Sequence, residues 1–157
     1  MSEFRRIPLK TGVTLNVALA GDRANPPVIL LHGFPESHRT WRGIAPRLED
    51  EFFLVMPDQR GFGGSDRPQE VDAYKGDVLI DDLFALAEAL SLDRFALVGH
   101  DWGGAIAWHA ALTGVPLDGL VILNAPHPVA FRRALYRRRP WWRRALWWVD
   151  PRPLRRR

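Results

Sequence analysis

The sequence has no cysteine, no long apolar run and no apolar signal core near its N-terminus. Without cysteine, a disulfide framework, a thiol nucleophile and a thiolate metal site are all excluded. A membrane-spanning helix needs roughly 18 or more consecutive apolar residues, and an export signal needs an apolar core close to the start of the chain. These absences favour a protein of the reducing cytoplasm without a membrane span.

Charge is divided unevenly along the 157 residues. Residues 132–157 hold eleven arginines and one acidic residue, whereas residues 1–131 hold 11 basic and 17 acidic residues. Four tryptophans lie among those arginines, at positions 141, 142, 147 and 148. Taken alone, interleaved aromatic and basic side chains indicate a nucleic-acid or membrane-surface patch. The rest of the chain provides a second interpretation of this segment.

Extended and helical patterns alternate along the chain. Apolar runs predict strands at residues 28–31, 52–56, 95–99 and 120–123, and a weaker alternation predicts a hairpin between 14–19 and the segment around Ile7. Apolar residues at helical spacing predict helices at 38–48, 77–90 and 103–112. Buried strands separated by helices pair in parallel through right-handed crossovers. The predicted fold class is therefore α/β, a mostly parallel sheet with helices on both faces.

A tight turn separates the strand at 95–99 from the helix at 103–112, and Asp101 lies at its centre between Gly99 and Gly103. This spacing is typical of a nucleophile elbow, whose glycines keep side chains away from the turn while the central residue is held in a strained conformation. An aspartate before a helix is also a common N-cap. The flanking glycines favour Asp101 as a nucleophile, with a carboxylate where serine is usual.

Three loops fall at the carboxyl ends of predicted strands, and together they resemble a known family. Their sequences are His32-Gly33-Phe34-Pro35-Glu36-Ser37, Asp58-Gln59-Arg60-Gly61-Phe62-Gly63-Gly64-Ser65-Asp66 and Gly99-His100-Asp101-Trp102-Gly103-Gly104. In order and spacing they are similar to the motifs of the α/β-hydrolase superfamily, and within it most similar to the epoxide hydrolases. The resemblance covers about residues 5–131.

The resemblance implies a mechanism and a substrate class. Asp101 is expected to attack a saturated carbon of a small apolar epoxide, giving an alkyl ester that water hydrolyses to a diol. The backbone N–H groups of Phe34 and Trp102 are expected to form the oxyanion hole. No cofactor, metal or nucleic acid is expected, and no cluster of His, Asp and Glu has metal-ligand spacing. The oligomeric state is left undetermined.

Several other polar residues have structural interpretations. His32 and His100 lie inside strand-end motifs where the family uses them structurally, so neither is expected to be a catalytic base. His109, in the middle of a predicted helix, is expected to be packed. The 58–61 loop suggests either a charged substrate clamp or a structural network beneath the active site, and the network is favoured.

There are three alternatives to epoxide hydrolysis, two of them enzymes and one not. Haloalkane dehalogenases share the aspartate nucleophile, but they usually place a polar, halide-contacting residue where this chain has Phe34. Haloacid dehalogenase chemistry needs an arginine beside the nucleophile, where this chain has Trp102. The other alternative, from a different class, is a non-catalytic truncated remnant or interaction protein.

The resemblance also implies parts that this sequence lacks. The family's catalytic histidine and its acid lie beyond later strands, and its epoxide-activating tyrosines lie in a lid inserted after the strand that ends near Asn124. Past His109 the sequence has only His127, in a motif that looks structural, and past the elbow it has only Tyr136. We expect residues 1–131 to be the N-terminal part of a truncated core, inactive as a fragment. Residues 132–157 are expected to be the start of the lid or an aberrant Arg/Trp-rich tail.

Overall fold

A computed structural model of the chain describes residues 3–136. The chain has two compact units, Met1–Ala125 and Pro126–Arg157, and each is described by itself. The Trp-rich and Arg-rich part of the tail, residues 137–157, lies outside the described residues, so the two interpretations of that segment stay predictions.

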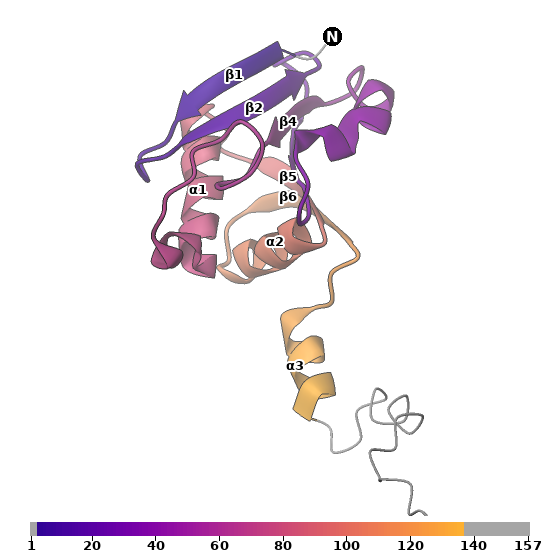
Figure 1. Cartoon of the computed structure of the whole chain (residues 1–157). Coiled ribbons are helices and arrows are strands. Elements are labelled where there is room, and N and C mark those ends of the chain that lie inside the picture. The colour runs from indigo at the N-terminus through magenta and orange to yellow at the C-terminus, as the bar shows by residue number, and fades with distance from the viewer. Residues whose placement is uncertain (1–2, 137–157) are drawn as a thin grey trace, which may run out of the picture. The chain divides into compact units, whose positions relative to one another are not determined.

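The first unit is built on a six-stranded sheet (Figure 1). Its strands follow the spatial order β1 (Glu3–Pro8), β2 (Thr14–Ala20), β4 (Phe53–Pro57), β3 (Pro27–Leu31), β5 (Phe95–His100) and β6 (Leu117–Leu123). The first two strands form the expected antiparallel hairpin, and β2 also runs antiparallel to β4. The pairs β3–β4, β3–β5 and β5–β6 are parallel. The predicted mostly parallel sheet is confirmed.

Alternate side chains of the central strands face two separate cores. Ile29 on β3 lies opposite Val55 on β4 and Leu97 on β5, and all three are completely buried. They pack in one core with side chains of α1 (Gly76–Ala89) and α2 (Trp102–Leu112), which Figure 1 shows together along one side of the sheet. Burying one such aliphatic side chain stabilises a fold by about 1.5–3 kcal/mol.

The other face of the sheet is covered by short 3₁₀ helices, η1 (His38–Gly43) and η2 (Ala45–Arg47). Trp41 and Ala45 from these turns pack against Leu30 and Leu54. Helices on both faces are therefore confirmed, but the continuous helix predicted at residues 38–48 is wrong. Pro46 has no N–H to donate, and in a continuous helix its ring would clash with the carbonyl four residues earlier, so the helix is broken into two tight turns.

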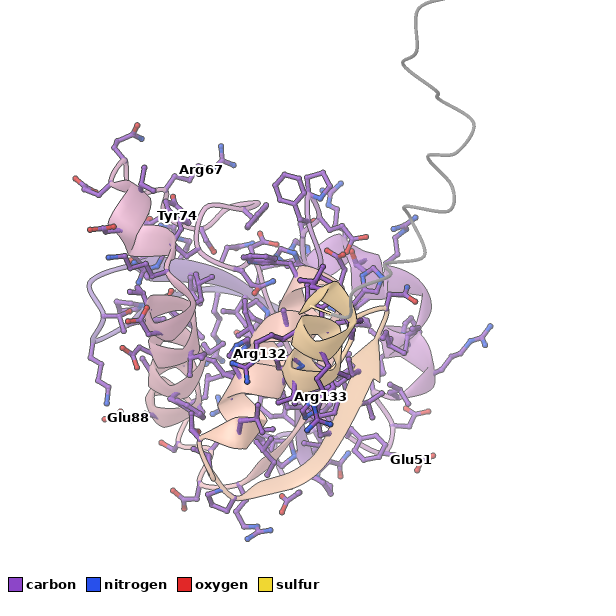
Figure 2. All side chains as sticks on the ribbon, turned by 90° about the horizontal axis from the view of Figure 1, so that it is seen from below. Glu51, Arg67, Tyr74, Glu88, Arg132 and Arg133 are labelled. Carbon is purple, nitrogen blue, oxygen red and sulfur yellow. The ribbon has the colours of Figure 1, made fainter. Side chains whose placement is uncertain are left out.

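The helix predicted at 77–90 is confirmed as α1, with its leucine stripe buried at Leu79, Leu83 and Leu86. It follows a long loop in which η3 (Val71–Tyr74) forms one further turn. Tyr74 fastens this loop through its hydroxyl, which donates to the Pro68 carbonyl at 2.9 Å. Figure 2 labels Tyr74 beside α1 and Glu88 near the other end of that helix, where the Glu88 carboxylate pairs with Lys10.

Of the second unit, the structure describes helix α3 (Pro128–Tyr136). Pro128 at its first position suits a helix start, because no N–H is needed there. The Val129 N–H donates to the His127 ring at 3.2 Å, and this capping contact fits the structural role expected for that histidine. Arg132 and Arg133 extend from α3 (Figure 2). Within residues 3–136, no helix is long and apolar enough to cross a membrane.

The strand order decides where chemistry can occur. Because β3 lies between β4 and β5 and all three are parallel, the loops that follow their carboxyl ends meet at one edge of the sheet. These loops begin at His32, Asp58 and Asp101, and they are the three loops that carry the sequence motifs.

Candidate active site

Asp101 lies in the turn between β5 and α2, with backbone angles φ 51° and ψ −113°. Residues other than glycine rarely adopt such a conformation, which costs about 1–3 kcal/mol. The glycines around Asp101 allow the turn to form: a Cβ on Gly99 would lie 2.5 Å from the Gly103 carbonyl oxygen, and one on Gly103 would press on the backbone of Leu31 and His32. The strained turn predicted from the glycine spacing is confirmed.

The Asp101 carboxylate accepts a hydrogen bond from the Phe34 backbone N–H, with N and Oδ1 separated by 3.0 Å. Hydrogen bonding by the Phe34 N–H, and to a smaller extent by the Trp102 N–H, lowers the pKa of Asp101 below its ordinary value. Burial has a weaker, opposing effect. Asp101 is therefore ionised at neutral pH. The structure thus brings together the three residues singled out in the sequence, Asp101, Phe34 and Trp102.

Glu36 organises the loop that carries Phe34, and sequence reasoning missed it. Its Oε2 accepts the Gly33 N–H at 2.8 Å and lies 3.1 Å from Nδ1 of His100. Burial alone would raise the pKa of Glu36, but the Gly33 N–H and His100 lower it. On the other side of the ring, His100 Nε2 lies 3.1 Å from the Asn124 side-chain amide. The sequence signal that could have predicted this contact is a carboxylate, Glu36, three residues after Gly33 at the end of a strand.

His32 is completely buried at the end of β3. Burial lowers the pKa of its imidazole, so the ring is neutral. Its Nε2 accepts the Gln59 backbone N–H at 3.0 Å, which leaves Nδ1 to donate to the Gly33 carbonyl at 2.8 Å. With both ring nitrogens used in this way, the side chain joins two loops, as the structural interpretation expected.

The loop after β4 is held in place by two buried acids, Asp58 and Asp82. Asp58 is 1% exposed and accepts hydrogen bonds from Asn16, Gly64 and the backbone and ring of His38. Burial by itself would raise the pKa of Asp58, but these hydrogen bonds together lower it. Such a carboxylate stabilises the loop and is not accessible to a substrate.

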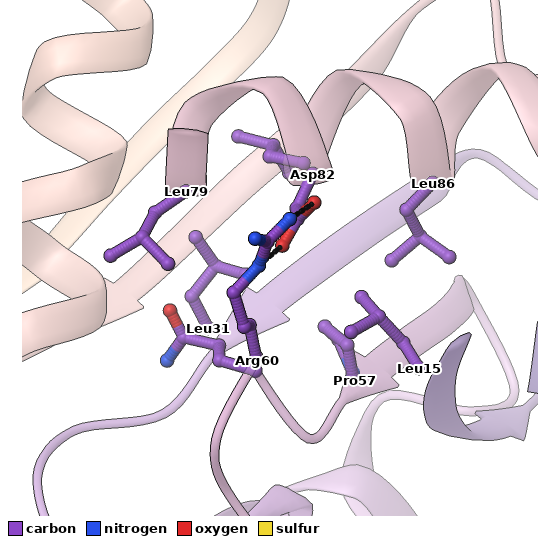
Figure 3. Close-up of a pocket in the computed structure, with 9 residues that line it drawn as sticks. Leu15, Leu31, Pro57, Arg60, Leu79, Asp82 and Leu86 are labelled. Carbon is purple, nitrogen blue, oxygen red and sulfur yellow. Dashed lines mark hydrogen bonds and ion pairs between the residues drawn. The ribbon is translucent and has the colours of Figure 1, made fainter. Parts of the chain in front are cut away.

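Arg60, from the same loop, points away from solvent and pairs with Asp82 of α1 (Figure 3). Its Nε and Nη2 donate to the two carboxylate oxygens at 2.7 and 2.6 Å. The adjoining cavity, lined in part by Leu15, Leu31 and Leu86, measures about 20 Å³, which is room for roughly one water molecule. The 58–61 loop therefore forms the expected structural network, and Arg60 is not a substrate clamp.

Aromatic side chains surround the Asp101 turn. Phe34 is 69% exposed and Trp102 is 50% exposed. The Phe62 ring meets the Phe34 ring edge to face, with centroids 5.9 Å apart. Exposed aromatic surface beside an ionised carboxylate suits an uncharged, apolar reactant.

These features are a strained glycine-flanked turn after a parallel strand and an amide donor from the neighbouring strand end, and they are typical of the strand-to-helix turn of alpha/beta hydrolases. The sequence model of a family described as "alpha/beta hydrolase fold" matches residues 26–150. The chain belongs to the alpha/beta hydrolase fold family.

Within this family the chain is epoxide hydrolase-like. It is 43% identical over 119 residues to the AB hydrolase superfamily protein YfhM of Bacillus subtilis, covering 74% of this chain and 42% of that protein. It is 42% identical over 122 residues to epoxide hydrolase 3 of Xenopus tropicalis, covering 77% of this chain and 33% of that protein.

Solved structures agree with the family. A structure described as one of the novel epoxide hydrolases from metagenomes of hot environments superposes with a TM-score of 0.84 and 48% identity, over 88% of this chain and 47% of that one. Epoxide hydrolase A from Mycobacterium thermoresistibile superposes with a TM-score of 0.75 and 35% identity, over 86% of this chain and 45% of that one. The alpha/beta hydrolase chain thus spans less than half the length of these relatives.

The remaining histidine of the alpha/beta hydrolase core, His109, corrects one expectation. It lies on α2, but it is exposed rather than packed, and its Nδ1 lies 2.8 Å from the Ala105 carbonyl of the same helix. The buried face of α2 consists instead of Gly103, Gly104, Ile106, Ala107 and Ala110. Among residues 3–136 no group of three or more His, Cys, Asp or Glu side chains could hold a metal ion.

Proposed function

We propose that this chain carries the nucleophile of an epoxide hydrolase and that Asp101 forms an alkyl ester with a small apolar epoxide. The observation that carries this proposal is the hydrogen bond from the Phe34 N–H to Asp101 Oδ1, 3.0 Å long, on an exposed carboxylate in a strained turn. Serine and cysteine serve acyl chemistry, whereas a carboxylate nucleophile suits displacement at a saturated carbon.

In the first step, a carboxylate oxygen of Asp101 bonds to an epoxide carbon while the bond from that carbon to the ring oxygen breaks. The ring oxygen leaves as an alkoxide and takes up a proton from solvent water, and the product is a hydroxyalkyl ester. The lowered pKa of Asp101, caused first by the Phe34 N–H, keeps the attacking group ionised at neutral pH.

In the second step, water attacks the carbonyl carbon of the ester, and the diol leaves with the alkyl oxygen that came from Asp101. Negative charge develops on the other carboxyl oxygen during this attack. The Phe34 and Trp102 N–H groups already point at the Asp101 carboxylate, and one such donor typically contributes about 2.7–4 kcal/mol of transition-state stabilisation. The same two amides therefore serve the carboxylate before reaction and the oxyanion during it.

Apolar surroundings and the named relatives support the substrate class. Phe34 and Trp102 expose aromatic surface beside Asp101, and proteins similar to this chain are named as epoxide hydrolases. A charged substrate would gain little from such a rim. We propose an aryl or alkyl epoxide without a charged group.

The test is covalent labelling of Asp101. The 157-residue chain is incubated with styrene oxide, and intact-mass spectrometry followed by peptide mapping measures the adduct. We expect at most one epoxide per chain and no sustained turnover, because the sequence has no match for the family's catalytic histidine or lid tyrosines. The adduct should lie on Asp101 and be absent from Asp101→Asn in incubations too brief for deamidation. Asp81→Asn, which changes an exposed aspartate on α1, is the matched control and should label normally. Equal labelling of the wild type and Asp101→Asn, or no labelling of either, would contradict the proposed nucleophile. A parallel incubation with a 1-chloroalkane in place of styrene oxide tests dehalogenation.

A further inference from the structure

The His32 carbonyl at the end of β3 connects three segments of the candidate site. It accepts a hydrogen bond from the Gln59 side-chain amide at 2.6 Å and a second one from the Gly103 N–H at 3.1 Å. The Gln59 backbone N–H donates to the ring of the same histidine. Gln59 is 7% exposed, so both of its contacts are inside the protein, where a hydrogen bond is electrostatically stronger than in water.

Both amide donors of the Asp101 carboxylate lie next to this connection. Phe34 is two residues after His32 in the chain, and Trp102 is immediately before Gly103. A shift of the His32 carbonyl would therefore move the Phe34 N–H and loosen the first turn of α2 at the same time. A hydrogen bond weakens steeply when its geometry changes by a few tenths of an ångström or a few tens of degrees.

We propose that Gln59 is a positioning residue for the Asp101 site: its side-chain amide holds the His32 carbonyl so that the Phe34 and Trp102 N–H groups point at the carboxylate. The side-chain amide and the backbone N–H of Gln59 both donate to His32, so Gln59 acts on Asp101 through His32. The effect of Gln59 on ester hydrolysis rests on the proposed function, whereas its effect on the position of the two N–H groups does not.

The first experiment uses nuclear magnetic resonance on the full chain and needs no substrate. In the wild type the Phe34 amide proton should respond to pH together with the Asp101 carboxylate. In Gln59→Leu the amide resonance should move upfield, and the titration midpoint of Asp101 should rise toward the ordinary aspartate range, because the Phe34 N–H is the first cause of its lowered pKa.

The matched control is Gln69→Leu. Gln69 belongs to the same loop, but its amide donates to the Arg67 carbonyl at 3.3 Å and is exposed, so neither the Phe34 resonance nor the Asp101 midpoint should change. Gln59→Met removes the amide while keeping an unbranched side chain, and it replaces Gln59→Leu if that variant does not fold. If both variants unfold, the proposal is overturned, because the amide would then serve the fold and not the site.

A second readout separates this inference from the proposed function. The ester preformed with styrene oxide should survive at least about tenfold longer in Gln59→Leu than in Gln69→Leu, since misplacing an oxyanion donor slows ester hydrolysis. If no ester forms in the wild type but Gln59→Leu still moves the Phe34 resonance and the Asp101 midpoint, the proposed function fails and the positioning role stands. Unchanged resonances, midpoint and ester lifetime in a folded Gln59 variant would overturn the inference.

Discussion

Breaking the Arg60–Asp82 pair is expected to cost much more stability than breaking a surface ion pair. The two side chains are 5% and 6% exposed, and the guanidinium donates to both carboxylate oxygens at 2.7 and 2.6 Å. Asp82 also accepts from the Thr11 hydroxyl at 2.5 Å, and Arg60 donates to the Ala73 carbonyl at 3.1 Å. The pair therefore fastens the loop after β4 and the β1–β2 turn to α1.

Asp82→Asn leaves a buried guanidinium without a counter-charge, and the expected loss is about 3–5 kcal/mol of unfolding free energy. A typical domain has only about 5–15 kcal/mol in total. Replacing both partners, in Arg60→Met with Asp82→Leu, removes the uncompensated charge and should recover most of that loss. The control is Asp118→Asn, which breaks the exposed Arg94–Asp118 pair, with side chains 61% and 42% exposed, and should cost at most about 1 kcal/mol.

Urea unfolding at pH 7, followed by circular dichroism, measures all four proteins. If Asp82→Asn is unfolded without denaturant, recovery of a cooperative transition in the double variant gives the same answer. A loss for Asp82→Asn no larger than that for Asp118→Asn would refute the reasoning. So would a double variant as unstable as the single one, because the cost would then come from lost packing and not from the unpaired charge.

Two further predictions concern the neighbouring elements. Asp58→Asn should cost about 1–3 kcal/mol of unfolding free energy at pH 7. Hydrogen bonds lower the folded-state pKa of Asp58 despite its burial. The stability that the ionised Asp58 contributes is therefore present above its unfolded-state pKa of about 3.9 and is lost as pH falls through its folded-state pKa. Urea titrations at pH 7 and near pH 3 should show the difference shrinking, and a constant difference would argue against it. Gly103→Ala should cost about 1–3 kcal/mol of unfolding free energy, since its Cβ would meet the backbone of Leu31 and His32. The control is Gly76→Ala, whose Cβ would meet nothing within 4 Å and which should be neutral or slightly stabilising. Thermal unfolding of the two variants compares their stability.

The sequence predicted the strands and the turn because their signals are local. Four continuous apolar runs correctly predicted β3, β4, β5 and β6. The glycines around Asp101 predicted a strained turn, and Asp101 has a φ of 51° in the structure. The same local reasoning failed at residues 38–48, where apolar spacing suggested one helix. One proline, Pro46, outweighed that spacing and produced two 3₁₀ turns.

Partners distant in the sequence could not be predicted. Asp81 and Asp82 are adjacent on α1, yet only Asp82 is buried, because the register of the 58–66 loop on that helix decides which carboxylate meets Arg60. Glu36 is a similar case, since its pairing with His100 spans 64 residues. His109 was wrongly expected to be packed because helical position alone does not say which face of α2 meets the sheet.

Two aspartates follow neighbouring parallel strands in this sheet, and their surroundings suit them to opposite tasks. Asp58 after β4 is 1% exposed, and each of its oxygens accepts two hydrogen bonds from the protein, so no oxygen is left to attack another molecule. Asp101 after β5 is exposed, and its pKa is lowered mainly by two backbone amides. Both carboxylates are ionised, but only Asp101 combines charge with access. Both aspartates follow a strand, so the number and direction of their hydrogen-bond donors suit Asp101 to the proposed chemistry and Asp58 to a structural role.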